Sequence, residues 1–158
     1  MKKISSLLMI LALIVSCLGD NETSQIDPNT DFSETNETEI LAYIAANNLV
    51  AEKTASGLYY VINEQGTGEQ PVASSNVTIT YRGTLTNGNV FDQNTIGFIT
   101  DLASVIPGWR EGIPLFREGG SGILLIPARL GYGARGVPRT IITPGAVLVF
   151  EVNLISVN

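Results

Sequence analysis

The sequence contains no histidine and only one cysteine, Cys17, among its 158 residues. Histidine is the commonest general base and metal ligand in proteins, and a lone cysteine can form neither an intramolecular disulfide nor a cysteine-based zinc site. Charged residues are also scarce at 15%, and the net charge of −6 disfavours nucleic acid as a partner. We therefore expect a protein without a metal, a cofactor or a catalytic triad.

No apolar run is long enough to cross a bilayer, since the longest covers only residues 7–15. This run follows Lys2 and Lys3 and ends at Ser16, which is the three-part pattern of an export signal over residues 1–16. The adjoining Ile-Val-Ser-Cys at residues 14–17 resembles a bacterial lipobox, whose cysteine becomes the lipidated first residue. An ordinary cleaved signal and a short uncleaved anchor remain as alternatives.

Lipidation of Cys17 would give a mature chain with seven basic and fifteen acidic residues, a net charge of −8. Several acyl chains on one residue exceed the roughly two lipid signals needed for stable anchoring. We then expect a lipid-anchored protein of the cell envelope that faces the periplasm or the cell exterior. Residues 17–35 are rich in Asn, Thr, Asp, Ser and Glu, which predicts a flexible spacer.

A short helical segment is predicted over residues 36–55. Asn36 can cap this helix with Glu39 three residues on, and Asn47 and Asn48 indicate its end. Its apolar stripe consists of Ile40, Leu41, Tyr43 and Ile44. The helix is too short to be stable alone, so it packs on the edge of the domain or takes part in dimerisation.

The remaining residues, 56–158, read as one α+β domain. Residues 77–85 alternate apolar and polar side chains, which predicts a strand with one buried and one wet face. Asn87-Gly88 predicts a tight hairpin into a second strand through Val90 and Phe91, followed by a loop. Further strands are expected at residues 58–62, 123–126 and 147–155, and a short helix at Pro107, limited by Pro114. We expect an antiparallel sheet wrapped around that helix.

Four segments of this domain together resemble the FKBP family of peptidyl-prolyl isomerases. They are residues 77–92, Val-Ile-Pro-Gly-Trp-Arg-Glu-Gly at 105–112, Ile-Pro at 126–127 with Gly-Tyr-Gly at 131–133, and residues 144–154. Their order and spacing carry the resemblance, which covers about half of the chain. It implies an FKBP-like fold and rotation about X-Pro bonds in exported polypeptides, without ATP or metal.

The resemblance also implies a site. Trp109 corresponds to the floor of the family's cleft, on which a proline ring rests. The apolar walls and the overhanging loop correspond to Tyr81, Phe91, Val105, Ile106, Phe150 and Ile142. Catalytic roles would fall to the Ile106 N–H, the Tyr132 hydroxyl and the Asp92 carboxylate. From the residues alone, the aromatic positions are equally what a small β-rich core needs.

Because the sequence departs from the family pattern in places, some of the residues that line the cleft are undetermined. A second wall aromatic corresponds to Ile96 or Phe98, depending on the alignment gap. The loop over residues 135–143 carries Val137 where some members have histidine, and Arg135 and Arg139 flank it. Sensitivity to macrolides, which the family's cleft also implies as ligands, is therefore undecided, as is the oligomeric state.

Two other functions remain compatible with the sequence. The cleft could hold prolyl segments with little catalysis, as a chaperone or tethering module on a membrane-anchored lipoprotein. The chain could also be a surface lipoprotein whose domain only displays loops to other molecules.

Overall fold

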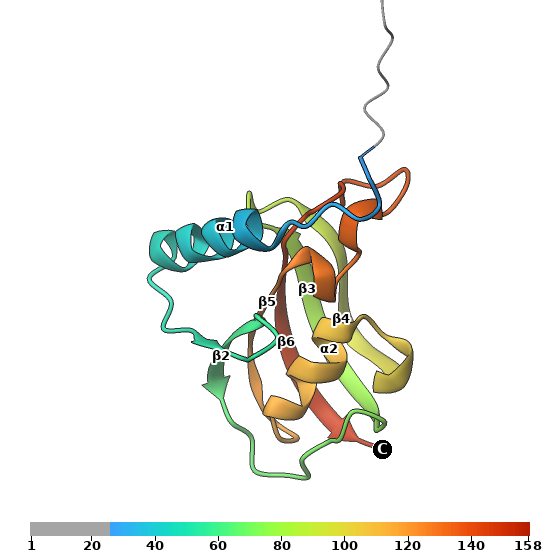
Figure 1. Ribbon diagram of the computed structural model, residues 1–158. Helices are drawn as coiled ribbons and strands as arrows, with labels where there is room; N and C mark the ends of the chain where they lie inside the picture. Colours follow the sequence, from blue (N-terminus) through green and yellow to red (C-terminus); the bar gives the residue numbers. More distant parts are fainter. Residues whose placement is uncertain (1–25) are drawn as a thin grey trace, which may run out of the picture.

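A six-stranded antiparallel sheet organises the chain, with strand order β1-β2-β5-β6-β3-β4 (Figure 1). The computed structural model describes residues 26–158. The strands are β1 Glu52–Lys53, β2 Tyr59–Glu64, β3 Asn76–Leu85, β4 Val90–Asp101, β5 Ser121–Ile126 and β6 Leu148–Val157. The α-helices are α1 Ser33–Ala46 and α2 Pro107–Gly112, and 3-10 turns follow at Leu102–Ser104, Ile113–Leu115, Ala128–Leu130 and Gly133–Arg135. The expected α+β architecture, an antiparallel sheet with a short helix against it, is confirmed.

The main core lies between α2 and the face of the sheet that α2 covers, here called the inner face. Pro107 occupies the first turn of α2, where a missing N–H costs nothing, and the helix tightens into a 3-10 turn one residue before Pro114. The expected short helix and its limit at Pro114 are thus confirmed. Ile113 and Phe116 are fully buried beneath the strands, which anchors the segment that carries Trp109.

The opposite, outer face of the sheet is partly covered by α1 (Figure 1). Ile40 of α1 is buried against a second cluster made by Tyr59, Leu125, Val147 and Val149. This confirms that the N-terminal helix packs on the domain. The prediction that one face of residues 77–85 is wet was wrong at Thr84, which is buried at 4% exposure.

Three details of the N-terminal segment differ from expectation. The helix begins at Ser33, so the predicted spacer over residues 17–35 ends earlier, and half-buried Phe32 already packs against the domain. Asn36 does not cap the helix but lies inside it, fully buried. Leu41 of the predicted stripe is 48% exposed, because it lies one residue further round the helix than Ile40. The helix ends at Ala46, as Asn47 and Asn48 predicted.

The hairpin between β3 and β4 also differs in detail. Only Gly88 has a positive φ, of 84°, and the Leu85 N–H bonds to Asn89 O, so the turn is longer than the two-residue form. The expected loop after Phe91 is wrong, because β4 continues to Asp101. Register shifts opposite Ile79 and Tyr81 allow this length, and Asn94 accepts hydrogen bonds from two amides within the bulge.

The predicted export signal and Cys17 lie outside the described residues. Among residues 26–158, no helix is long and apolar enough to pass through a membrane.

Candidate functional site

A cleft of about 510 Å³ opens between the inner face of the sheet, α2 and the loop that precedes β6. This volume falls in the range of small-molecule and peptide side-chain sites. All nine of the site residues predicted from the sequence line it. The complete lining is Tyr81, Phe91, Asp92, Phe98, Ser104, Val105, Ile106, Trp109, Tyr132, Val137, Thr140, Ile142 and Phe150.

Trp109 forms the floor of the cleft. Its indole is only 4% exposed and meets Tyr81 and Phe150 edge to face, with ring centroids 5.0 and 5.2 Å apart. Such contacts favour one ring orientation over others. Among the described residues, Nε1 of Trp109 is the one buried side-chain polar atom without a hydrogen-bond partner. The floor is therefore an aromatic surface whose orientation is supported from two sides by Tyr81 and Phe150.

The walls consist of aromatic rings from three different strands. Phe91 of β4 and Phe150 of β6 meet edge to face at 5.3 Å, and Phe98 of β4 meets Tyr81 of β3 at 5.9 Å. The strand between them has Gly83 where the rings converge, and a Cβ there would stand 2.6 Å from the Phe91 ring. The absence of a side chain at this position lets the two rings reach the cleft.

Polar groups stand at the rim of the cleft. The Tyr81 hydroxyl donates a hydrogen bond of 2.7 Å to Oδ2 of Asp92, one strand away. Tyr132 lies between two glycines and is 40% exposed, with its ring available to the cleft. Ile106 precedes α2, and its carbonyl accepts hydrogen bonds from Trp109 and Arg110. Within the described residues, no backbone acceptor pairs with the Ile106 N–H, which leaves that donor free.

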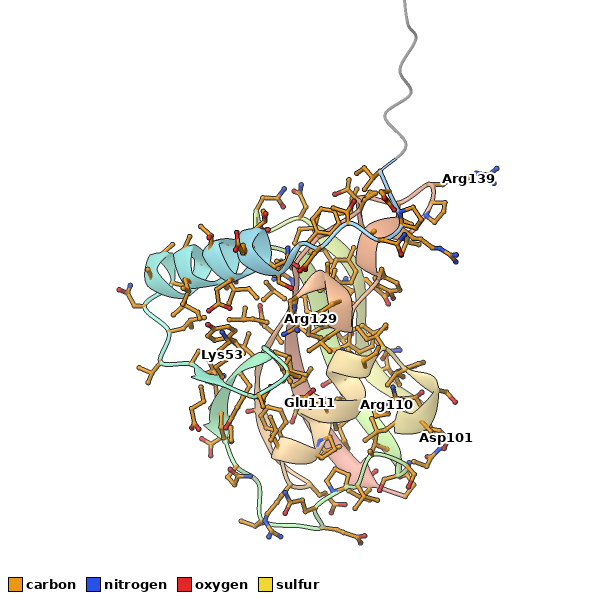
Figure 2. The ribbon with its side chains drawn as sticks, in the orientation of Figure 1. Lys53, Asp101, Arg110, Glu111, Arg129 and Arg139 are labelled. Carbon is orange, nitrogen blue, oxygen red and sulfur yellow. The ribbon has the colours of Figure 1, made fainter. Side chains whose placement is uncertain are left out.

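The structure shows which residue forms the wall that the sequence left undetermined. Phe98 lines the cleft, whereas Ile96 is 93% exposed at the tip of the β4 bulge. Val137 and Thr140 also line it, although neither was among the predicted site residues. The family pattern marks the Val137 loop as undetermined, but no pattern marks Thr140, because it reaches the cleft only through the folding of that loop. Arg139 of the same loop extends away from the body of the protein (Figure 2).

The environment of Tyr81 predicts a pH dependence of stability. Burial, followed by the hydrogen bond to Asp92, raises the pKa of Tyr81 above its ordinary value of 10. The unfolded chain then loses this proton first, so the stabilisation is complete below about pH 10 and is lost as pH rises through the folded-state pKa. We expect the unfolding midpoint in urea to fall more steeply above pH 10 for the wild type than for Tyr81→Phe. Parallel curves would contradict the assigned environment.

The sequence is similar to those of known proteins. Residues 67–155 match the family described as FKBP-type peptidyl-prolyl cis-trans isomerase. A "Probable FKBP-type peptidyl-prolyl cis-trans isomerase FkpA" of Neisseria meningitidis is 44% identical over 108 residues, which cover 66% of this chain and 39% of that protein. An "Outer membrane protein MIP" of Legionella longbeachae is 41% identical over 106 residues, covering 65% and 45%. The chain thus spans less than half the length of these two relatives.

A solved structure agrees with the sequence matches. The crystal structure of FkpA from Escherichia coli superposes with a TM-score of 0.70 and 36% identity, covering 80% of this chain and 61% of that one. The chain belongs to the FKBP-type peptidyl-prolyl cis-trans isomerase family.

Proposed function

We propose that this chain is a peptidyl-prolyl cis-trans isomerase that assists the folding of exported polypeptides in the cell envelope. The observation that carries the proposal is the cleft itself, which has Trp109 as its floor, aromatic walls and only a few polar groups at its rim. Family membership supports the same reaction. The corresponding isomerase domain is residues 56–158, preceded by the N-terminal segment that carries α1, Ser33–Ala46.

The reaction suits an apolar cleft. Resonance imposes a barrier of about 18–20 kcal/mol on rotation about the X-Pro bond, and no covalent bond has to break. Twisting removes this resonance and returns charge from the carbonyl oxygen towards nitrogen, so the twisted amide is less polar than either planar isomer. A site that binds the twisted form better accelerates the exchange about tenfold for each 1.36 kcal/mol of preference.

The named residues divide this work. The Trp109 ring holds the proline, with Tyr81, Phe91, Val105, Ile142 and Phe150 excluding water around it. The free Ile106 N–H and the Tyr132 hydroxyl hold carbonyl groups that flank the rotating bond. Asp92 accepts the hydrogen bond of the Tyr81 hydroxyl and so orients the Tyr81 ring beside the floor. None of these steps uses a nucleophile, a metal or a cofactor.

A protease-coupled assay on a prolyl tetrapeptide separates this function from that of a binding module. The isomerase predicts a rate constant for the cis-to-trans step that rises linearly with protein concentration. A chain that binds the peptide but leaves the uncatalysed rate unchanged would instead be a proline-binding chaperone. The exposed Tyr132 and the Val137 loop, which both line the cleft, are compatible with that second function.

Substitutions at the rim should affect turnover more than stability. Tyr132→Phe removes one hydroxyl from a side chain that is 40% exposed, and Asp92→Ala removes the acceptor of the Tyr81 hydroxyl at an exposed position. We expect each to lower kcat/KM about threefold to tenfold, while the free energy of unfolding changes by less than about 1 kcal/mol. Urea unfolding and the coupled assay on the same samples check this. Full activity in both variants would refute the assigned roles.

The second part of the proposal is a lipid anchor at Cys17, with residues 1–16 as a signal that is removed. The lipobox resemblance supports it, and a relative named as an outer membrane protein agrees with an envelope location. Mass measurement of the chain purified from membranes should give an amino-terminal peptide that begins at a diacylated or triacylated Cys17. An unmodified Cys17 would remove the anchor and leave the isomerase proposal unaffected.

We also propose that macrolides bind in the cleft and compete there with prolyl peptides.

A further inference from the structure

Asn36 is one of only two buried polar residues in the described part of the chain. A buried amide is costly unless its donor and acceptor are both paired. Both are paired here: Nδ2 donates to the Gly145 carbonyl at 2.8 Å, and Oδ1 accepts from the Ala128 N–H at 2.7 Å. These partners lie 109 and 92 residues away in the sequence. One side chain of α1 thus binds two distant backbone groups at once.

The two backbone groups mark the ends of a single loop, residues 129–144, here called the cleft loop. It supplies four of the residues that line the cleft: Tyr132, Val137, Thr140 and Ile142. Its interior is tied by only a few backbone hydrogen bonds, among them Val137 N–H to Ile142 O at 2.8 Å. Gly145 N–H also reaches Gly133 O at 3.0 Å, which closes the base of the loop just where Asn36 binds it.

The segment that leads into α1 supports the same place. Gly145 has a φ of +77°, and a Cβ there would collide with the Phe32 ring, so this glycine lets the chain approach the start of α1 closely. In Figure 1 the blue segment before α1 runs beside the red-orange loop that precedes β6. The base of the cleft loop therefore lies against the N-terminal segment.

We propose that Asn36 is a positioning residue for the cleft: through it, α1 holds both ends of the cleft loop and so sets the placement of Tyr132 and Ile142. This inference rests on the proposed isomerase function. Loops place functional side chains reproducibly only when a rigid scaffold fixes their ends. Without the Asn36 amide, the Ala128 N–H and the Gly145 carbonyl lose their partners, and the loop populates arrangements in which the cleft is incomplete.

Asn36→Ala tests the proposal against a matched control. Ile40→Ala removes an equally buried side chain of the same helix, one turn later, that packs on the sheet and has no hydrogen bond to the cleft loop. Both variants should lower the melting temperature. At a temperature where both are fully folded, we expect Asn36→Ala to lower kcat/KM about tenfold, mainly through a higher KM, and Ile40→Ala to stay within about twofold of wild type.

Hydrogen exchange gives a readout that does not depend on activity. In Asn36→Ala the amides of residues 128–146 should exchange at least about tenfold faster than in the wild type and in Ile40→Ala, whereas those of β3 and β6 should not. A lowered apparent kcat with unchanged KM and unchanged exchange in the loop would show a purely structural role and overturn the inference. Equal losses in both variants would overturn it as well. An inactive wild type would instead defeat the proposed function, while the exchange comparison would still decide whether Asn36 fixes the loop.

Discussion

Replacement of Trp109 by alanine should lower kcat/KM for a prolyl peptide at least about 100-fold, which corresponds to about 2.7 kcal/mol of lost transition-state binding. The indole lines the floor of the cleft and makes edge-to-face contacts with both Tyr81 and Phe150. Its removal also leaves a cavity in the core, which costs about 3–5 kcal/mol of folding free energy. Kinetics and urea unfolding on the same preparations measure both effects.

Phe116→Ala is the matched control for the loss of Trp109. Phe116 is fully buried in the same core, follows the same helical segment and does not line the cleft. It should cost a similar free energy of unfolding, yet leave the activity of the folded protein within about threefold of wild type. If both variants lose activity to the same extent, general loosening of the core explains the effect, and the floor assignment fails.

Gly83→Ala should damage the cleft by adding a single methyl group. The new Cβ would stand 2.6 Å from Cε2 of Phe91 and 2.9 Å from Cε1 of Phe150, so at least one wall ring must move. Overpacking of this kind costs about 1–3 kcal/mol of stability. Because the displaced rings form the wall beside the proline, we expect kcat/KM to fall about tenfold or more, measured with the coupled assay.

Gly112→Ala is the control for Gly83→Ala, because it distinguishes damage to the cleft wall from damage to the core. Its Cβ would meet the Leu124 side chain at 2.7 Å, a contact nearly as tight as the 2.6 Å at Gly83, but Leu124 does not line the cleft. The variant should lose comparable stability and keep most of its activity. Wild-type activity in Gly83→Ala would mean that the Phe91 and Phe150 rings do not define the substrate wall.

Much of the fold could be predicted from local patterns. Alternation in residues 77–85 predicts β3, and the Pro107 and Pro114 positions predict a short, interrupted helix. These signals work because strand burial and helix starts depend on residues close in sequence. The length of β4 could not be predicted in this way. Its pairing depends on bulges opposite β3, and Gly97 within it reads locally as a turn.

Asn36 shows the same limit of local patterns, because its pattern is clear but predicts the wrong role. Beside Glu39 it matches a helix cap, which is the commonest use of asparagine at such a position. Its actual partners are Ala128 and Gly145, and no pattern within α1 indicates contacts so far along the chain.

The cleft residues illustrate the difference between burial and function. Tyr81, Phe91 and Phe150 are also typical core residues, so the residues alone left open whether they line a site. The family resemblance placed them, and the structure brings them together with Trp109 around one opening. Phe98 could not be distinguished from Ile96, because the β4 bulge between Asn94 and Phe98 decides which side chain faces the cleft.

The central claim is that rotation about the X-Pro bond takes place on Trp109. The chain contains one tryptophan, so its indole N–H gives a single, unambiguous signal in a nitrogen–proton NMR spectrum. With a prolyl peptide in excess, we expect exchange cross-peaks between the cis and trans forms, together with a saturable shift of the indole signal at the same protein concentration. Exchange without an indole shift would place catalysis elsewhere, and an indole shift without exchange would make the protein a binding module.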